Sequence, residues 1–391
     1  KLSVSLIAPT LHDAQLAVAE LGDVVGEFPF DGEPGMGLSV WLALVLTMLA
    51  RPAIDGSVPA FVFDASASRS GKSLLVKTAG LLVHGRLPPT TSAPKGDQDE
   101  WDKLLRTVAL EGWPLLFLDN VTGRLKSAAL EAFVTSGGAV RGRVLGESRS
   151  TDTDKCPTVV AVTSNNATLG PDMVGRSLHC RLDPGVEAPG LRSGWRHHPL
   201  EVWVLAQRAR LLGATCTLLR AHAVAGRPAE GASLGGFESW SAIVGSALAW
   251  VGLPDPVASQ AELKSNADEE TDALGAVLTA WRAQFGDKPM TAAQALRDAQ
   301  PELRGVLAEW FETDYVTAVK LGKNIHTVRG RIAAGLKFVQ KTKHAGTTSW
   351  VVVQGGVVGV EGVFPYRNRK MLDHICICRG GKWPPTPTTP P

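Results

Sequence analysis

The sequence predicts an α/β fold with a mostly parallel sheet, flanked by helical segments and followed by a smaller winged-helix-like domain. Two observations lead to this prediction. Short β-rich apolar runs alternate with helical spacing from about residue 59 to 183, which is the alternation expected when helices connect parallel strands. Helical patterns precede and follow this stretch, and another set of helical patterns ends in a hairpin pattern before about residue 355.

Length and composition describe a folded protein of two or three domains. The chain has 391 residues, of which 44% are hydrophobic and 20% charged, so wholesale disorder is excluded. A net charge of +2 is too small to indicate a nucleic-acid partner by itself. Five scattered cysteines do not resemble a secreted disulfide framework, so a reducing cytoplasm is expected. The longest apolar run, residues 38–50, is shorter than the ~20 residues that cross a bilayer, and no membrane association is predicted.

Changes in pattern along the chain divide it into five segments. Apolar residues at helical spacing predict an N-terminal helical segment over 1–55 and a helical subdomain over 198–255, on either side of the α/β core over 56–197. After a linker rich in Pro and acids, helical patterns and then two β-rich runs around a turn predict a winged-helix-like domain over 268–355. Residues 356–391 end in a Pro/Thr-rich tail, which is predicted to be irregular.

A Gly-Lys-Ser motif follows the first strand of the α/β core. Residues 60–63 form an apolar strand pattern, and helical spacing resumes after Gly71-Lys72-Ser73. Glycine lets backbone N–H groups approach phosphate, lysine reaches the β and γ oxygens, and serine binds Mg²⁺. The motif predicts a P-loop for ATP and Mg²⁺, although Ser66 stands where its first glycine is expected; the alternative is a chance motif at a turn. The predicted binding residues are Ser68, Arg69, Ser70, Gly71, Lys72 and Ser73.

Two later strand patterns end in polar residues. The run 115–118 precedes Asp119-Asn120, and an acid at this place in P-loop NTPases holds Mg²⁺ together with the motif serine, here Ser73. Asn120 stands where a second acid usually activates water; an amide cannot accept that proton, so the general base is unassigned and Glu131 is a weak candidate. The run from Thr158 ends at Asn165, whose amide is suited to orienting water or contacting the γ-phosphate. The alternatives are an ordinary buried strand and a turn.

Two arginines follow the polar strand. Arg176 and Arg181 lie in the stretch Gly175-Arg-Ser-Leu-His-Cys-Arg-Leu-Asp. An arginine here is a candidate for reaching the nucleotide of a neighbouring subunit and stabilising charge during phosphoryl transfer. The alternative is a pair of surface arginines.

The order of these motifs resembles superfamily III helicases, and more narrowly the helicase half of phage and mobile-element primase-helicases. The resemblance rests on Gly71-Lys-Ser, Leu118-Asp-Asn, Thr163-Ser-Asn-Asn and the Gly175 stretch, and it covers about residues 25–355. It implies an AAA+-type ring, expected to be a homo-hexamer, that hydrolyses ATP between subunits and moves along single-stranded DNA. It further implies that Lys72, Ser73 and Asp119 bind nucleotide and Mg²⁺, that Asn165 is the polar sensor, and that Arg176 or Arg181 acts in trans.

Basic residues gather in two places that are candidates for binding DNA. Arg141 and Arg143 precede the third strand, where these helicases carry a hairpin that grips DNA in the central pore. A second, acid-free set lies between Tyr315 and Lys343 and is an electrostatic footprint for phosphate backbones. For both sets the alternative is a solvated surface. The second set comprises Lys320, Lys323, Arg329, Arg331, Lys337, Lys341 and Lys343.

These patterns lead to one functional hypothesis and two alternatives. The hypothesis is an ATP-dependent DNA helicase or translocase in phage or mobile-element replication, with single-stranded or forked DNA as partner. Because the sequence begins at Lys1 rather than Met, it is expected to be a fragment of a longer protein. The resemblance to the helicase half of primase-helicases implies a primase domain upstream. One alternative is a DNA-binding initiator or regulator that uses nucleotide as a switch with little turnover. The other is a degenerate P-loop scaffold that binds no nucleotide.

Overall fold

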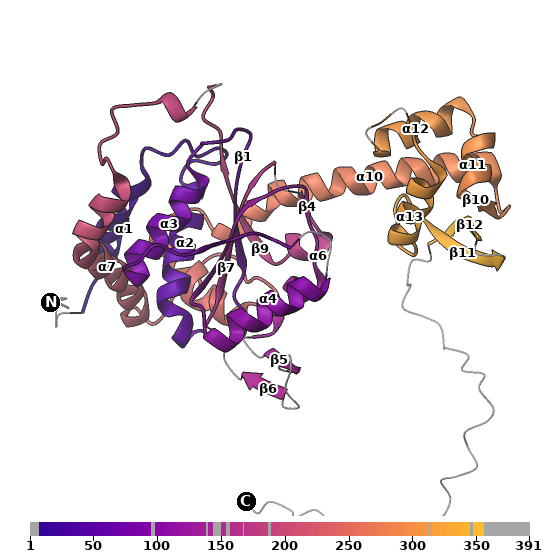
Figure 1. Ribbon diagram of the computed structural model, residues 1–391. Coiled ribbons are helices and arrows are strands. Elements are labelled where there is room, and N and C mark those ends of the chain that lie inside the picture. The colour runs from indigo at the N-terminus through magenta and orange to yellow at the C-terminus, as the bar shows by residue number, and fades with distance from the viewer. Residues whose placement is uncertain are drawn as a thin grey trace, which may run out of the picture. The chain divides into compact units, whose positions relative to one another are not determined.

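The computed structural model describes two compact units, Lys1–Asp272 and Ala273–Pro391 (Figure 1). The described residues are 8–94, 98–137, 140–143, 150–153, 157–166, 168–186, 189–311, 313, 315–344 and 347–355. The predicted irregular tail, 356–391, lies outside them.

A five-stranded sheet forms the centre of the N-terminal unit, and all its neighbouring strands are parallel. Residues 60–63, 115–118 and 159–162 of three neighbouring strands are continuous apolar runs because helices cover both faces of the sheet. Every residue of β1 (Ala60–Ala65), for example, is buried. The predicted α/β fold with a mostly parallel sheet and flanking helices is therefore confirmed. In spatial order the strands are β2 (Thr90–Thr91), β3 (Leu115–Val121), β7 (Val159–Asn165), β1 (Ala60–Ala65) and β9 (Ser177–Leu182).

The chain reverses direction across this sheet, and the reversal creates a crevice. From β1 it crosses to the edge strand β2, and the later connections run back the other way to β9. Right-handed crossovers then put α3 (Lys72–His84) on one face, and α4 (Gln98–Glu111), α5 (Ala128–Thr135) and α6 (Pro171–Val174) on the other. The connections that leave β1 and β7 therefore run in opposite directions and over opposite faces of the sheet. The topological switch point lies between the carboxyl ends of these two neighbouring strands. Open α/β sheets bind ligands at such a point.

A buried helix, α2 (Met36–Ala50), packs beside α3 and β9. With η1 (Arg51–Ala53) it gives one segment, Met36–Ala53, that is long and apolar enough to cross a membrane, but 72% of that segment is buried inside the protein. Its polar group at Thr47 is satisfied, since the Thr47 hydroxyl donates to Ala43 O at 2.6 Å and accepts from Trp240 Nε1 at 2.7 Å. These features are those of a core helix.

The helices before and after the sheet share its hydrophobic core. Helix α1 (Leu11–Val25) packs along α7 (Leu200–Val224), and α7 also contacts α3. The further elements of this unit are the short pairs β4 (Arg124–Leu125) with β8 (Thr168–Leu169) and β5 (Val140–Arg143) with β6 (Ser150–Thr153), then η2 (Pro189–Leu191), α8 (Glu238–Trp240), η3 (Ser241–Gly245), α9 (Ser246–Trp250) and η4 (Pro256–Ser259). Helix α10 (Gln260–Phe285) begins in this unit and ends in the next.

The C-terminal unit has a separate core of helices and a small antiparallel sheet. Trp281 lies at its centre, with its ring edge-on to Phe338 at a centroid distance of 5.2 Å. Helices followed by a hairpin are present as the sequence pattern indicates, whereas the winged-helix assignment stays a prediction. The elements are α11 (Ala292–Asp298), α12 (Pro301–Phe311), α13 (Ala318–Val328), β10 (Met290–Thr291), β11 (Leu336–His344) and β12 (Thr347–Gln354).

Candidate functional site

The segment that connects β1 to the first turn of α3, residues 66–73, is named the Gly-Lys-Ser loop. Its left-handed positions are Arg69 (φ 59°) and Gly71 (φ 102°), so Ser66 needs no glycine-like backbone. A Cβ on Gly71 would lie 2.7 Å from the ring of Phe28, so both conformation and space require glycine there. Gly71 is also the N-cap of α3, which directs the free N–H groups of the helix toward this loop.

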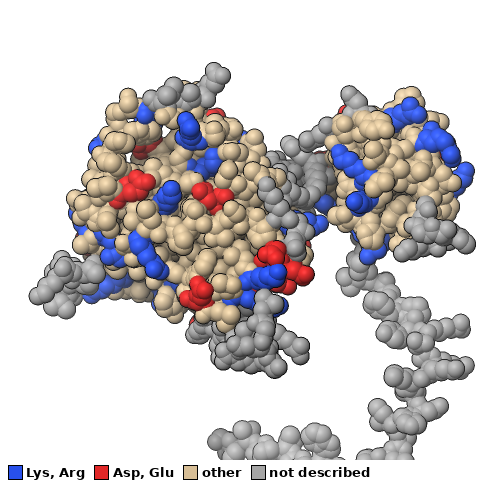
Figure 2. Space-filling model, in the orientation of Figure 1, with Lys and Arg blue, Asp and Glu red and all other residues tan. Residues whose placement is uncertain are grey.

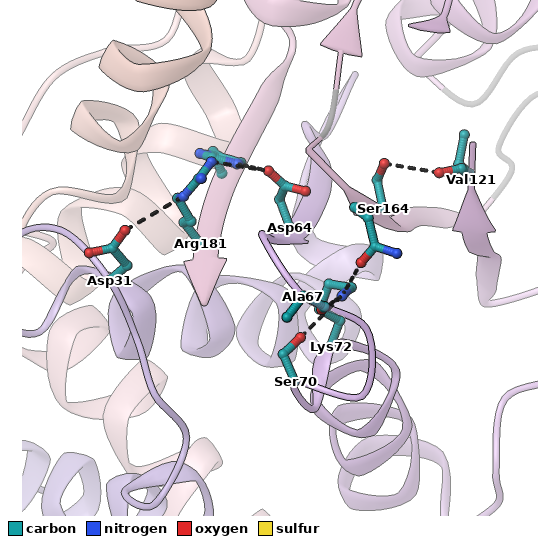
Figure 3. Close-up of polar contacts among 10 residues, drawn as sticks. Asp31, Asp64, Ala67, Ser70, Lys72, Val121, Ser164 and Arg181 are labelled. Carbon is teal, nitrogen blue, oxygen red and sulfur yellow. Dashed lines mark hydrogen bonds and ion pairs between the residues drawn. The ribbon is translucent and has the colours of Figure 1, made fainter. Parts of the chain in front are cut away.

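The side chain of Lys72 extends from the first residue of α3 to Asn165 at the carboxyl end of β7. Its side-chain Nζ donates to Asn165 Oδ1 at 2.7 Å, to Ser70 Oγ at 3.1 Å and to Ala67 O at 3.1 Å. Figure 3 shows it pointing toward Ser70 and the backbone of Ala67. Burial lowers the pKa of Lys72, and the nearby carboxylates of Asp64 and Asp119 oppose that shift. The structure therefore holds a buried cation with all three of its donors engaged.

Asp119 connects the Gly-Lys-Ser loop to β7. Its Oδ1 accepts hydrogen bonds from Ser73 Oγ and from Thr163 Oγ1, each at 2.6 Å. The next residue, Asn120, is left-handed (φ 55°), and its backbone N–H donates to Thr163 Oγ1 at 2.8 Å. Asn tolerates this conformation better than most residues. The irregularity in the β3–β7 pairing between Leu118 and Val121 thus presents a carboxylate beside the Ser73 hydroxyl.

Oxygen donors beside the loop suit a magnesium ion bound together with phosphates. Within the described part of the chain no group of three or more His, Cys, Asp or Glu side chains is arranged to hold a metal. Magnesium does not require such a cage, because it usually binds one or two carboxylates, keeps several waters and takes substrate phosphate oxygens. Asp119 and Ser73 supply two of these oxygens. The donor set therefore fits Mg²⁺ as a companion of a phosphate ligand.

A cavity of about 380 Å³ lies over the Gly-Lys-Ser loop. It brings together predicted residues from three strand ends, with Asn120 and Asn165 facing the loop. Its charged lining residues are three basic ones, Arg69, Lys72 and Lys77, and one acidic one, Glu201, so the cavity suits an anion. It is lined by Ser68, Arg69, Ser70, Gly71, Lys72, Ser73, Leu74, Lys77, Asn120, Thr163, Asn165 and Glu201.

A second, more apolar cavity of about 570 Å³ adjoins the first and shares the loop residues 69–71 with it. Phe28 and Trp195 supply aromatic rings to its wall. The segment bearing Trp195 is tied to the end of α1, since Arg196 pairs with Asp23 and His197 Nε2 lies 2.9 Å from Asp23 Oδ2. Burial by itself raises the pKa of Asp23, but its contacts with His197 and Arg196 bring that pKa below the ordinary value.

The two predicted finger arginines lie at opposite ends of β9. Arg181 pairs in register with Asp64 near the carboxyl end of β1; its guanidinium lies 3.5 Å from Asp64 and 3.5 Å from Asp31 (Figure 3). Arg176 precedes β9 and accepts a backbone hydrogen bond from Ala60, the first residue of β1. It is therefore about one strand length, ~17 Å, from the loop of its own chain. Arg181 is engaged within the chain, whereas Arg176 is too distant to act in cis.

Glu131 lies with Arg176, away from the two cavities. Burial raises the pKa of this carboxyl, Asp172 raises it further, and Arg176 and Lys126 lower it. Glu131 lines neither cavity beside the Gly-Lys-Ser loop. Its role as a general base remains a prediction, and the geometry gives no path from it to the loop of the same chain.

Several residues of this site are not among those predicted from the sequence. Phe28 packs on Gly71, while Lys77 and Glu201 line the cavity over the loop. Lys77 lies one helical turn beyond Ser73, which is a periodicity signal that was available in the sequence. Phe28 and Glu201 are distant in sequence, and no local pattern indicates that they meet the loop.

The basic residues predicted to bind DNA fall into two groups. Arg141 and Arg143 lie on β5, which pairs with β6 as a hairpin, but their side chains are outside the described residues, as is that of Lys343. The others belong to the C-terminal unit, where basic side chains predominate over acidic ones on the face visible in Figure 2. On that unit Lys320, Lys323, Arg329 and Lys341 are exposed, and Arg331 and Lys337 are half-buried.

Comparisons with known proteins leave the family of the chain open. No family model and no curated protein matches the sequence. Among solved structures, an apo A form of the NrS-1 C-terminal region is 12% identical with a TM-score of 0.38, and the match covers 90% of this chain and 78% of that one. Another apo A form of the same region is 10% identical with a TM-score of 0.34, covering 86% and 75%. Likeness of this degree assigns neither an activity nor an assembly to this chain.

Proposed function

We propose that the chain is a Mg²⁺-dependent ATPase that acts on DNA as a helicase or translocase in phage or mobile-element replication. The observation that carries the proposal is the meeting of three strand ends at one switch point. Lys72 bonds Asn165 at 2.7 Å there, and Ser73 bonds Asp119 at 2.6 Å. A cation, a side-chain amide and a serine hydroxyl that donates to a carboxylate are parts that phosphoryl transfer needs.

Each residue has a task that its position supports. Lys72 exchanges its present acceptors for β and γ phosphate oxygens, and the N-terminus of α3 adds its N–H groups. Asp119 and Ser73 hold Mg²⁺, which when bound neutralises charge on those oxygens. Asn165 is free to orient a water molecule once Lys72 turns to phosphate. The adjoining apolar cavity, with Phe28 and Trp195 in its wall, has the size and lining for a nucleoside.

Hydrolysis between subunits is part of the proposal. Arg176 is too far from the loop of its own chain to stabilise charge there, yet it sits at the outer end of β9, beside Ala60. A neighbouring copy that meets this edge with its own Gly-Lys-Ser loop would receive Arg176 as a finger. The expected assembly is a ring, and single-stranded DNA is expected to contact the β5–β6 hairpin and the C-terminal unit.

ATP hydrolysis with and without single-stranded DNA tests this proposal. We expect DNA-stimulated turnover that both Lys72→Ala and Arg176→Ala abolish, while the surface controls Lys103→Ala and Arg210→Ala retain it. Mixing the two inactive variants should restore part of the turnover, because some interfaces then pair an intact Lys72 with an intact Arg176. Absence of turnover in the wild type would refute the ATPase. Turnover without recovery in the mixture would refute the shared site.

A second function is favoured by Asn120. The residue near the end of β3 where a second acid is expected is an amide, and Glu131 does not line the cavity over the Gly-Lys-Ser loop. A DNA-binding initiator or regulator that uses ATP as a switch would show ATP binding lost in Lys72→Ala, ATP-dependent DNA affinity and negligible turnover. A strand-separation assay distinguishes the two functions directly.

A further inference from the structure

The C-terminal unit carries an open cavity of about 450 Å³ between the end of α12 and the face of α13. Two adjacent aromatic residues, Trp310 and Phe311, line one side. Their rings meet edge to face with centroids 5.0 Å apart, and both are half-buried. The remaining lining residues come from one helix and are Lys320, Lys323, Asn324 and Thr327. This cavity and its six residues are called the α12–α13 groove.

Helical periodicity explains why α13 presents these residues together. Leu321 and Ile325 are fully buried against the core of the unit and fix the orientation of the helix. The groove residues at 320, 323, 324 and 327 follow the spacing of a second stripe on the same helix. Thr317 caps the N-terminus of α13 by accepting from Lys320 N, so the stripe begins at the first turn.

The chemistry of the groove combines cations with aromatic faces. Lys320 Nζ lies 5.1 Å from the Phe311 ring centroid, a cation–π distance that keeps the ammonium beside the ring. Among the described residues that line the groove, the charged ones are Lys320 and Lys323. Asn324 adds a side chain that both donates and accepts hydrogen bonds. A further aromatic residue, Tyr315, is 80% exposed in the segment between α12 and α13.

We propose that the α12–α13 groove binds one unpaired base of single-stranded DNA, with Trp310 and Phe311 contacting the base and Lys320 and Lys323 contacting the flanking phosphates. Aromatic surfaces beside lysines are the combination that proteins use to hold single strands. The volume suits a nucleotide. This inference deepens the proposed function and rests on its DNA-binding part, but it does not require the chain to hydrolyse ATP.

The half-buried aromatic residues favour a single strand over a duplex. In a duplex the faces of the bases are stacked on one another, so aromatic rings set in a groove cannot reach them without unstacking. Lysines on a helix serve duplex backbones equally well. A duplex would, however, leave the accessible parts of Trp310 and Phe311, whose remaining surface packs on the core of the unit, without a ligand contact. An unpaired strand exposes base faces at no such cost.

Fluorescence anisotropy of the full chain with labelled oligonucleotides tests the inference without nucleotide present. The probe is an oligothymidine of about 12 nucleotides, within the range of single-strand sites. An abasic strand of the same length keeps the phosphates and removes the bases. We expect the abasic strand to bind roughly 10-fold more weakly, and Trp310→Ala to reduce that difference. Equal binding of the two strands by the wild type would overturn base contact, whatever the stability of the variant.

The salt dependence of DNA affinity distinguishes a phosphate contact of Lys320 from a purely structural role, because only a phosphate contact changes the slope. Lys320→Ala should lower the slope of log affinity against log salt by about 0.7, the value for one phosphate contact of a single strand. Lys288→Ala, an exposed lysine of the same unit outside the groove, should leave the slope unchanged. Tighter binding of duplex DNA or oligouridine, lost in Lys320→Ala, would overturn the assignment to single-stranded DNA. ATP hydrolysis measured on the same samples separates failure of the groove from failure of the ATPase.

Discussion

Replacing Gly71 by alanine tests the reasoning about the Gly-Lys-Ser loop at its tightest point. Two independent penalties act there. The φ of 102° is strained for any residue with a Cβ, and the new Cβ would lie 2.7 Å and 3.0 Å from two ring carbons of Phe28. Backbone strain costs about 1–3 kcal/mol and overpacking about 1–3 kcal/mol, so Gly71→Ala should reduce the free energy of unfolding by roughly 2–6 kcal/mol.

A double-mutant cycle with Phe28→Ala separates the two penalties. Shortening Phe28 removes the clash and leaves the backbone strain, so the double variant should be more stable than the sum of the single effects predicts, by about 1–3 kcal/mol. Gly175→Ala is the matched control. That glycine has φ −68° at the end of α6, and nothing lies within 4 Å of its Cβ position.

Chemical denaturation of the five proteins, followed by far-UV circular dichroism, gives the comparison as shifts in midpoint. ATP affinity measured alongside should fall in Gly71→Ala, because relief of the clash displaces the loop. A cost no larger than that of Gly175→Ala would refute the strained geometry of the loop. Additive effects of Gly71→Ala and Phe28→Ala would refute the packing of Phe28 on Gly71.

Three further predictions concern charge at the same unit. Asp119→Asn should weaken Mg²⁺-dependent nucleotide binding roughly 10-fold or more and leave metal-free binding unchanged or tighter, which calorimetry with and without Mg²⁺ can measure. Because burial lowers the pKa of Lys72 below 10.5, nucleotide affinity should fall as pH rises through that lowered pKa; Lys72→Arg stays charged and should lose this dependence. The pKa of Asp23 is below 3.8 in the folded state, so the stability that it contributes is full above 3.8 and lost as pH falls through the lower value. Asp23→Asn should therefore show a smaller loss of unfolding midpoint between neutral and acidic pH than the wild type.

The sequence was sufficient for features that are local. Residues 60–63 and 115–118 are apolar runs that a sheet covered on both faces requires, and each becomes a buried parallel strand. The Gly-Lys-Ser loop is contiguous, so its residues meet without any tertiary information. Asn165 was found because it ends a strand, and the carboxyl ends of parallel strands share one edge of the sheet.

Features that depend on long-range packing were beyond the sequence patterns. An apolar helical face shows that α1 and α7 are buried on one side, but not that they pack on each other within the core of the sheet. The contact of Phe28 with Gly71 and the place of Glu201 beside the loop have the same origin. Each of these contacts joins segments more than 40 residues apart in the sequence, and local sequence patterns do not indicate which distant segments are in contact.

The length of β9 determines which of the two arginines can lie near the Gly-Lys-Ser loop of its own chain. Arg176 and Arg181 stand in one short stretch of sequence, yet the length of β9 puts them at opposite edges of the sheet. For Arg176 to act on the nucleotide of a neighbouring subunit, the amino edge of the sheet in one subunit must meet the carboxyl edge of the sheet in the next subunit. In an isologous dimer each subunit would have to contribute both its amino and its carboxyl edge to the same interface. In a head-to-tail contact one subunit contributes its amino edge and the other its carboxyl edge. Head-to-tail contacts that close generate rings, so the proposed finger and the proposed ring depend on the same geometric fact.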